Sequence, residues 1–256
     1  MDEPTPFDPS AIRAVAFDGY GTLFDFTMTH FRVEVTSLLM AQGVQVDHEA
    51  FFETWTKAYA QGDVWQRDER DPRPMLERML AGPLPDWHSQ WEIWRRQFAH
   101  ALDTHGVRGD AAGAADHFRA RLTESPPYPD ALDTIEALHA RGYALALLSN
   151  ADEDFLQGAL VRSRLRFSVI QSSESLRAYK PHQAVFGALC GRLGLEGPEV
   201  LYVGDSPIAD VTGASRAGLR TAWVRRTEAP YPERAPKPDV SLDDLAGLLG
   251  TLPPRA

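Results

Sequence analysis

The sequence predicts an α/β fold, a doubly wound parallel sheet with a second, all-helical domain inserted after its first strand. Short apolar runs alternate with helical stretches, and each run ends at polar residues. This is the pattern of buried parallel strands with helices on both faces of the sheet. By contrast, residues 27–125 contain no strand-like run and have the pattern of several helices separated by Gly and Pro, which predicts the inserted domain.

The first predicted strand is residues 12–17 (IRAVAF), which runs into Asp18. Four similar runs follow the inserted domain, at residues 143–148, 167–170, 200–203 and 221–224. The helices predicted between these strands are residues 130–140, 152–160, 182–193 and 208–217. Residues 225–239 are rich in proline and are expected to form an irregular connection to a last helix near residues 242–249.

These elements divide the chain into two domains. The sheet domain comprises residues 1–26 and 126–256, and the helical domain comprises residues 27–125. The second boundary is the cluster at residues 126–129 (PPYP), because a helix cannot continue through a run of prolines. With 256 residues, 43% of them hydrophobic, the chain has ample apolar material for packed cores, which excludes a disordered or fibrous protein.

Composition also limits the partners and the compartment. The chain has 26 Lys and Arg against 36 Asp and Glu, a net charge of −10, which argues against binding to nucleic acid. No apolar run approaches the roughly 18 residues that a membrane span requires, and residues 1–10 lack the pattern of a secretion signal. We therefore expect a cytoplasmic protein with a small-molecule substrate and no membrane contact, either a monomer or a homodimer. The single cysteine, Cys190, is expected to be a core residue.

Polar side chains stand directly after the predicted strands, or a short loop beyond them. The carboxyl ends of parallel strands meet at one edge of a sheet, so we expect these side chains to lie together. One carboxylate can act as a nucleophile, a hydroxyl can hold an oxyanion, a lysine can offset negative charge, and further carboxylates can hold a hard cation. This set describes displacement through an aspartyl-enzyme intermediate. The residues are Asp18, Thr22, Ser149, Asn150, Lys180, Asp205 and Asp210.

Four motifs carry these residues: FDGYGTLFD at residues 17–25, LLSN at 147–150, YKP at 179–181 and VGDSPIAD at 203–210. In order and spacing they resemble the four motifs of the haloacid dehalogenase-like (HAD) hydrolase superfamily. The resemblance implies a Rossmann-like core with an inserted helical cap, which would be residues 27–125. It also implies a hydrolase that works through an aspartyl-enzyme intermediate.

The resemblance implies a role for each motif residue. Asp18 would be the nucleophile, and Lys180 would balance the accumulated negative charge. The ligands of the transferred group would be Thr22, Ser149 and Asn150.

A magnesium ion is also implied by the resemblance. Its ligands would be Asp18, the backbone carbonyl of Tyr20 and Asp205, while Asp210 would support either the metal or Lys180. Mg²⁺ is therefore the cofactor that we expect.

At one position of the first motif, the residue differs from the one that the phosphatases of the superfamily usually have. They usually carry a second aspartate two positions after the nucleophile, which protonates the leaving alkoxide, and here that position is Tyr20. Tyrosine has a reference pKa of about 10 and is a poor substitute for that acid and base, although Tyr20 stays among the candidate catalytic residues. The 2-haloacid dehalogenases of the superfamily have a tyrosine there, and a departing halide needs no proton. Tyr20 thus favours carbon–halogen cleavage. In a phosphatase it would imply acidic leaving groups, an acid supplied by the cap, or a slow enzyme.

Other features favour a magnesium-dependent phosphatase of a small phosphorylated metabolite. The dehalogenases work without metal and have a Ser-x-Asn arrangement where this chain has residues 205–207 (DSP), and a carboxylate there would repel Asp18 unless a cation were present. Phe186 stands where they have tyrosine, and no counterpart of their halide-binding arginine is evident near Trp55. We therefore predict the phosphatase. A metal-independent (S)-2-haloacid dehalogenase is the alternative, and a non-catalytic binding protein on the same scaffold is a further one.

Overall fold

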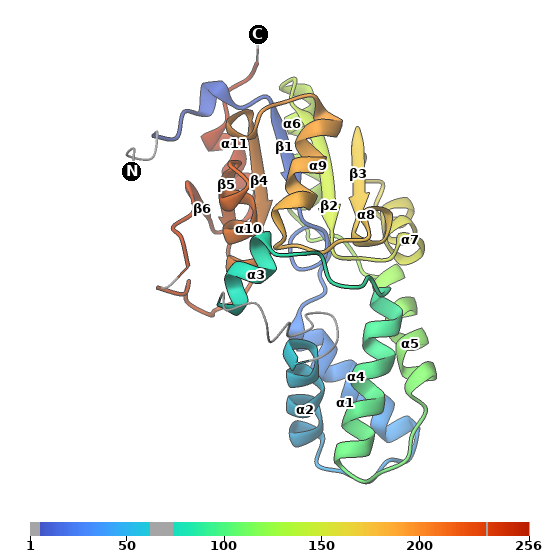
Figure 1. Cartoon of the computed structure of the whole chain (residues 1–256). Helices are drawn as coiled ribbons and strands as arrows, with labels where there is room; N and C mark the ends of the chain where they lie inside the picture. The colour runs from blue at the N-terminus through green and yellow to red at the C-terminus, as the bar shows by residue number, and fades with distance from the viewer. Residues whose placement is uncertain (1–5, 62–73, 234, 256) are drawn as a thin grey trace.

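The computed structural model describes residues 6–61, 74–233 and 235–255 of the chain. Figure 1 shows a sheet flanked by helices and, below it, a separate bundle formed by helices α1, α2, α4 and α5. The described parts contain no helix that combines the length and the apolar character needed to cross a membrane.

The sheet has six strands, all parallel, in the order β3-β2-β1-β4-β5-β6. Strand β1 is central, and the strand order reverses beside it, so the prediction of a doubly wound parallel sheet is confirmed. The four residues of β1 are fully buried, as expected of a strand covered on both faces. The strands are β1 (Ala14–Phe17), β2 (Ala144–Ser149), β3 (Val169–Ser172), β4 (Val200–Gly204), β5 (Arg220–Val224) and β6 (Val240–Leu242).

Alternate side chains of β1 enter two different hydrophobic clusters, because successive residues of a strand face opposite sides of the sheet. Val15 and Phe17 join the cluster that contains residues of α6, α7 and α11, whereas Ala14 and Ala16 join the cluster that contains residues of α9 and α10. The sheet is therefore covered on both faces. The helices of this domain are α6 (Ala131–Ala140), α7 (Glu153–Ser163), α8 (Ser173–Leu176), α9 (Gln183–Leu193), α10 (Gly213–Arg216) and α11 (Leu248–Thr251).

The second bundle, which we call the cap, packs around aromatic side chains. The Phe118 ring lies 5.0 Å from that of Phe31, 5.4 Å from that of Phe98 and 5.6 Å from those of Trp55 and Trp94, measured between centroids. Such ring pairs add to the stabilisation that the buried area provides. The cap helices are α1 (Met28–Ala41), α2 (His48–Gln61), α4 (Gln90–Thr104) and α5 (Ala111–Thr123).

One part of the inserted segment lies on the sheet domain instead of in the cap. Helix α3 (Met75–Ala81) lies beside α9 and α10 in Figure 1, and its Glu77 forms an ion pair with Arg216 of α10. The chain then returns toward the cap, with the carbonyl of Gly82 2.9 Å from the His182 ring nitrogen. The inserted segment therefore covers part of the sheet domain as well as forming the cap.

Several element bounds differ from those that the sequence predicts. The last predicted helix is preceded by β6, an edge strand of three residues, and the chain then forms η5 (Leu245–Gly247) and the short α11. The expected helix over residues 208–217 begins as a π-helical turn, η4 (Pro207–Thr212), which continues into α10. Strands as short as β6 carry too few residues for a recognisable pattern. Two further 3₁₀ turns are η1 (Pro9–Ala11) and η3 (Gly197–Glu199).

Candidate active site

The predicted nucleophile lies at the carboxyl end of the central strand. Asp18 directly follows β1, is 6% exposed, and donates its backbone N–H to the carbonyl of Val203 at 2.9 Å. The loop after it turns tightly at Gly21, which has φ +90°. A Cβ atom at Gly21 would lie 2.8 Å from a carboxylate oxygen of Asp205, so a larger residue there would disturb both the turn and that carboxylate.

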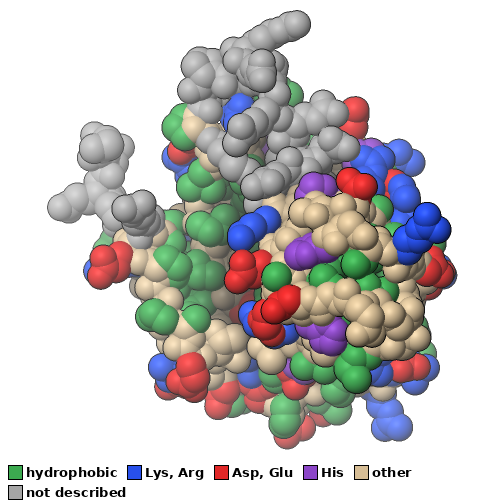
Figure 2. Space-filling view, turned by 90° about the horizontal axis from the view of Figure 1, so that it is seen from below, with side chains coloured by type: hydrophobic (Ala, Val, Ile, Leu, Met, Phe, Trp, Pro, Cys, Tyr) green, Lys and Arg blue, Asp and Glu red, His purple; other side chains and the backbone are tan. Residues whose placement is uncertain are grey.

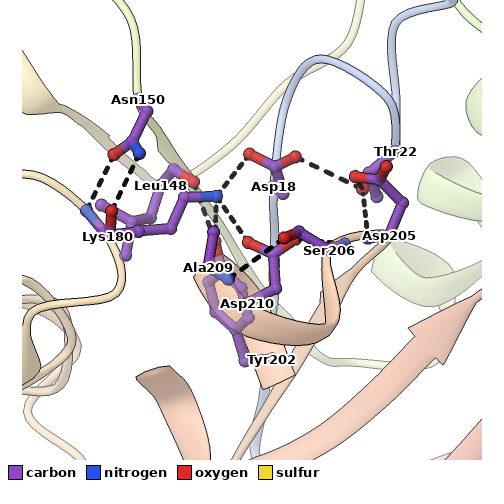
Figure 3. A network of polar contacts seen from close by, with 10 residues as sticks. All are labelled: Asp18, Thr22, Leu148, Asn150, Lys180, Tyr202, Asp205, Ser206, Ala209 and Asp210. Atoms are coloured by element: carbon purple, nitrogen blue, oxygen red, sulfur yellow. Dashed lines mark hydrogen bonds and ion pairs between the residues drawn. The ribbon is translucent and has the colours of Figure 1, made fainter. Parts of the chain in front are cut away.

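Lys180 joins the buried carboxylates of the site, as Figure 3 shows. Its Nζ donates to Asp18 Oδ1 at 2.5 Å, to Asp210 Oδ1 at 2.6 Å and to the Tyr202 hydroxyl at 3.1 Å. An ammonium group has three N–H donors, so these three acceptors fix its orientation. Burial alone would lower the pKa of Lys180, but the charges of Asp18 and Asp210 outweigh burial and hold it well above the ordinary value. Lys180 therefore stays cationic.

Tyr202 is a site residue that the sequence analysis missed. The residue lies in the middle of β4. Its hydroxyl donates a hydrogen bond to the carbonyl of Leu148 at 2.9 Å and accepts one from Lys180. The ring of Phe186 packs edge-on against Tyr202, with centroids 5.1 Å apart. A tyrosine inside an otherwise apolar buried strand needs a partner for its hydroxyl, which was the available signal.

The fourth motif places two further carboxylates beside Asp18. Thr22 Oγ1 lies 3.4 Å from Asp18 Oδ2 and 3.2 Å from Asp205 Oδ1, and Asp210 Oδ2 accepts the backbone N–H of Ser206 at 2.9 Å. One carboxylate oxygen from each of Asp18, Asp205 and Asp210 lies within 4.8 Å of the other two. Oxygen donors in such a group suit a hard cation such as Mg²⁺.

The electrostatics of these carboxylates depend on whether a cation is present. Burial, followed by the charges of Asp210 and Asp18, raises the pKa of Asp205 to about 8, which favours its protonated form when no cation is present. Burial also raises the pKa of Asp18, to about 6, although Lys180 opposes this shift. Asp18 is therefore largely ionised at neutral pH, as a nucleophile must be.

The two polar residues at the end of β2 have different surroundings. Ser149 is 2% exposed, and its hydroxyl oxygen lies 2.8 Å from the position that a Cβ atom on Gly19 would occupy, beside Asp18. Asn150 instead uses both ends of its amide on the backbone of Lys180: it donates to the carbonyl at 3.1 Å and accepts from the N–H at 2.8 Å. Asn150 thus supports the lysine loop, and the substrate contact expected from the sequence stays a prediction.

Tyr20 stands between the cap and the sheet domain. Its ring lies 5.3 Å from that of Phe24 and 5.7 Å from that of Phe155, and its hydroxyl donates to the carbonyl of Leu122 at 3.2 Å or of Phe155 at 3.3 Å. Burial and the nearby charges of Asp154 and Asp18 raise the pKa of Tyr20 above its ordinary value. The hydroxyl faces backbone carbonyls and holds its proton tightly, a poor arrangement for acid–base work.

Comparisons of the sequence and of the structure with known proteins point to the same family. The model of the haloacid dehalogenase-like hydrolases matches residues 12–218. The chain is 30% identical over 222 residues to (S)-2-haloacid dehalogenase 4A of Burkholderia cepacia, covering 86% of each chain. It is 33% identical over 203 residues to a phosphoserine phosphatase of Thermus thermophilus, covering 77% of each. A solved structure of a dehalogenase with an intermediate complex has a TM-score of 0.71 and 27% identity, covering 96% of this chain and 99% of that one.

Proposed function

Since the chain belongs to the haloacid dehalogenase-like hydrolases, we propose that it releases halide from a small 2-haloacid, with Asp18 as the nucleophile. The relatives described as 2-haloacid dehalogenases support this proposal, and so does the solved dehalogenase structure. The dehalogenase therefore takes precedence over the magnesium-dependent phosphatase that the fourth motif favours in the sequence.

The observation that carries the proposal is the position of Tyr20. Its hydroxyl is hydrogen-bonded to backbone carbonyls and holds its proton tightly, so the residue two positions after the nucleophile cannot protonate a leaving group. An alkoxide leaving group needs such a proton, whereas a halide leaves as a stable anion. The site is therefore best suited to a leaving group of low basicity.

The reaction can proceed with the groups in the site. A carboxylate oxygen of Asp18 attacks the carbon that bears the halogen, so that a carbon–oxygen ester bond forms as the halide departs with the bonding electrons. Water then attacks the ester, giving the 2-hydroxy acid, a proton and the free carboxylate. Lys180, 2.5 Å from Asp18, orients the nucleophile and keeps it ionised.

Asp205 is compatible with this reaction in the absence of a metal. Burial and the charges of Asp210 and Asp18 raise its pKa to about 8, which favours the protonated form, and a protonated Asp205 does not repel the ionised Asp18 as a second carboxylate would. A protonated carboxyl group is also a hydrogen-bond donor, which suits it to a site that handles anions.

A second candidate function is a magnesium-dependent phosphohydrolase. The specific observation in its favour is the group formed by Asp18, Asp205 and Asp210, which could hold Mg²⁺. The bound ion would neutralise charge on a phosphoryl group, which is much of what phosphoryl transfer requires. The position of Tyr20 restricts this candidate to acyl or aryl phosphates, whose leaving groups need little protonation.

Two assays on the same preparation separate these candidates. Halide release from (S)-2-chloropropionate is measured in the presence of a chelator, and phosphate release from an aryl phosphate is measured with and without Mg²⁺. The proposal expects halide release that survives chelation and is lost in Asp18→Asn. Magnesium-dependent phosphate release without halide release would replace it with the second candidate, and neither activity would favour a non-catalytic binding protein.

A further inference from the structure

Asp152 caps a helix of the other domain instead of its own. It stands at the N-cap position of α7, yet its side chain accepts no hydrogen bond from that helix. Its Oδ1 accepts the backbone N–H of Gln90 at 2.8 Å and its Oδ2 accepts that of Trp91 at 3.0 Å, both in the first turn of the cap helix α4. The first amide of α7, that of Glu153, donates to the Glu174 carboxylate at 2.6 Å. The sheet domain thus supplies the N-terminal capping group of α4.

These contacts supply partners for amides at the start of α4. The first four N–H groups of a helix have no partner within it. The helix makes its own first bond from the N–H of Ile93 to the Ser89 carbonyl at 3.0 Å. Of the amides before it, that of Glu92 donates to Ser89 Oγ at 3.1 Å, and Asp152 accepts those of Gln90 and Trp91. The negative charge of Asp152 also suits the positive end of the helix dipole.

Because Asp152 is buried, its contacts with α4 can form only when the cap lies against the sheet domain, which we call the closed arrangement. Asp152 is 6% exposed, and burial raises its pKa although the Trp91 and Gln90 amides oppose the shift. A buried carboxylate that lost both donors would be an unpaired charge, which is strongly unfavourable. Separation of α4 from the sheet domain therefore has to re-expose Asp152 to water.

The same segment of the cap contacts the loop that carries Lys180, on both sides of the lysine. The Tyr179 hydroxyl donates to the carbonyl of His88, and the His182 ring nitrogen lies 2.9 Å from the carbonyl of Gly82. Tyr179 also packs against Ile93 and Trp87 in a small hydrophobic cluster. Residues 82–93, which we call the strap, thus join the loop of Lys180 to the loop that follows Ser149.

We propose that Asp152 is a positioning residue that docks the strap onto these two catalytic loops and so fixes the closed cap over the Asp18 site. The inference rests on the proposed function only in taking Asp18 as the nucleophile, and it holds for either leaving group. Without Asp152 the closed, binding-competent form is less populated, and apparent substrate affinity falls in proportion. Saturating substrate restores the closed form.

The expected kinetic signature of Asp152→Ala is therefore a KM raised about tenfold with kcat within about twofold, the size expected from losing two charge-assisted hydrogen bonds partly replaced by water. Asp152→Asn keeps one acceptor oxygen and is expected to have a smaller effect. The matched control is Asp154→Asn. Asp154 lies on the same helix and pairs with Arg119 of the cap, but its side chain is 46% exposed, so this pair is expected to contribute little.

Hydrogen–deuterium exchange of the free enzyme tests the inference without any substrate. Peptides that cover residues 86–94 are expected to exchange about tenfold faster in Asp152→Ala, while peptides from β1 and β4 keep the rate of the unaltered protein. Asp154→Asn is expected to exchange like the unaltered protein throughout. Unchanged exchange at residues 86–94 in both Asp152 variants, or faster exchange there with an unchanged KM, would overturn the inference. Because the exchange result needs no turnover, an inactive enzyme would count against the proposed function alone.

Discussion

At the centre of the site, one buried ammonium group is shared by two carboxylates and a phenol. The side chains of Lys180 and Asp210 are 3% and 1% exposed, and the side chain of Asp18 is 9% exposed. The cost of burying the carboxylates is offset mainly by the lysine, together with hydrogen bonds from the Thr22 hydroxyl and the Ser206 amide. We expect the same contacts to serve folding and catalysis.

Lys180→Met is expected to lower the free energy of unfolding by about 3–5 kcal/mol, because it leaves Asp18 and Asp210 buried without their cation. Activity is expected to fall by at least about 10³-fold, since Asp18 then takes up a proton more readily. Urea unfolding and the hydrolase assay measure both effects. Lys57→Met is the control, because Lys57 is 65% exposed and pairs with Glu53 on the surface. Equal effects of the two substitutions would contradict this account.

We expect any binding of magnesium to depend on Asp205, one of three carboxylates that could hold the ion. We expect saturating Mg²⁺ to raise the melting temperature, because an ion that binds only the folded state stabilises it, by about 2.7 kcal/mol at a hundredfold excess over Kd. Asp205→Asn is expected to remove most of this rise, because the amide carries no charge. Differential scanning calorimetry with and without chelator is the measurement. A melting temperature that ignores Mg²⁺ in the unaltered protein would exclude the metal site and strengthen the metal-free reaction.

At the scale of elements, a half-buried acid joins two helices of the cap. Glu34 of α1 accepts hydrogen bonds from His117 at 2.6 Å and from Arg121 at 2.9 Å, both on α5, and its side chain is 14% exposed. Burial opposes ionisation, but the hydrogen bonds from His117 and Arg121 outweigh it and hold the pKa of Glu34 below its ordinary value. The ionised form of Glu34 therefore stabilises the helix pair.

The stabilisation from Glu34 is expected to depend on pH. A lowered pKa contributes stability that is fully present above the unfolded value of 4.5 and is lost as pH falls through the folded pKa. Glu34→Gln should therefore lower the free energy of unfolding by about 1 kcal/mol at pH 7 and by much less near pH 3. Urea unfolding at both pH values tests this. Glu49→Gln, at an exposed ion pair with Arg32, is the control, and a pH-independent difference for Glu34→Gln would refute the assignment.

At the scale of the whole molecule, the cap and the sheet domain share one hydrophobic cluster. Residues from β1 and α6 and residues from α1, α4 and α5 all belong to it. Phe155 of α7 is part of the junction, with its ring centroid 5.6 Å from that of Trp94 in the cap and 5.7 Å from that of Tyr20. Figure 2 shows the molecule from below, with the cap toward the viewer. Charged and histidine side chains lie on this outer face of the protein.

Because this cluster is continuous, we expect the two domains to unfold in a single cooperative transition. Five of the six tryptophans lie in the inserted segment, so tryptophan fluorescence reports mainly on the cap, whereas far-ultraviolet circular dichroism reports on all helices and strands. The two urea transitions should coincide. A fluorescence midpoint clearly below the dichroism midpoint would mean that the cap unfolds by itself.

The core of the fold and most residues of the candidate site could be predicted from the sequence. Asp18 and Asp205 each follow a buried strand and Ser149 ends one, and the carboxyl ends of parallel strands meet at one edge whatever the details of packing. Local pattern and order along the chain are sufficient for this result, because the geometry of a parallel sheet supplies the rest. The alternation of strands and helices predicted the doubly wound topology for the same reason.

Only the tertiary structure decided which polar groups are partners. Asp152 has the pattern of an N-cap of its own helix, but its side chain bonds to amides 61 and 62 residues earlier in the chain. Tyr202 reaches Lys180, and the Tyr20 hydroxyl faces backbone carbonyls instead of the reacting atoms. Hydrogen-bond partners far apart in sequence depend on how whole elements pack, and local residue patterns carry no information about that packing. The sequence therefore determined which polar residues meet at the edge of the sheet, and the packing of whole elements decided how those residues are held.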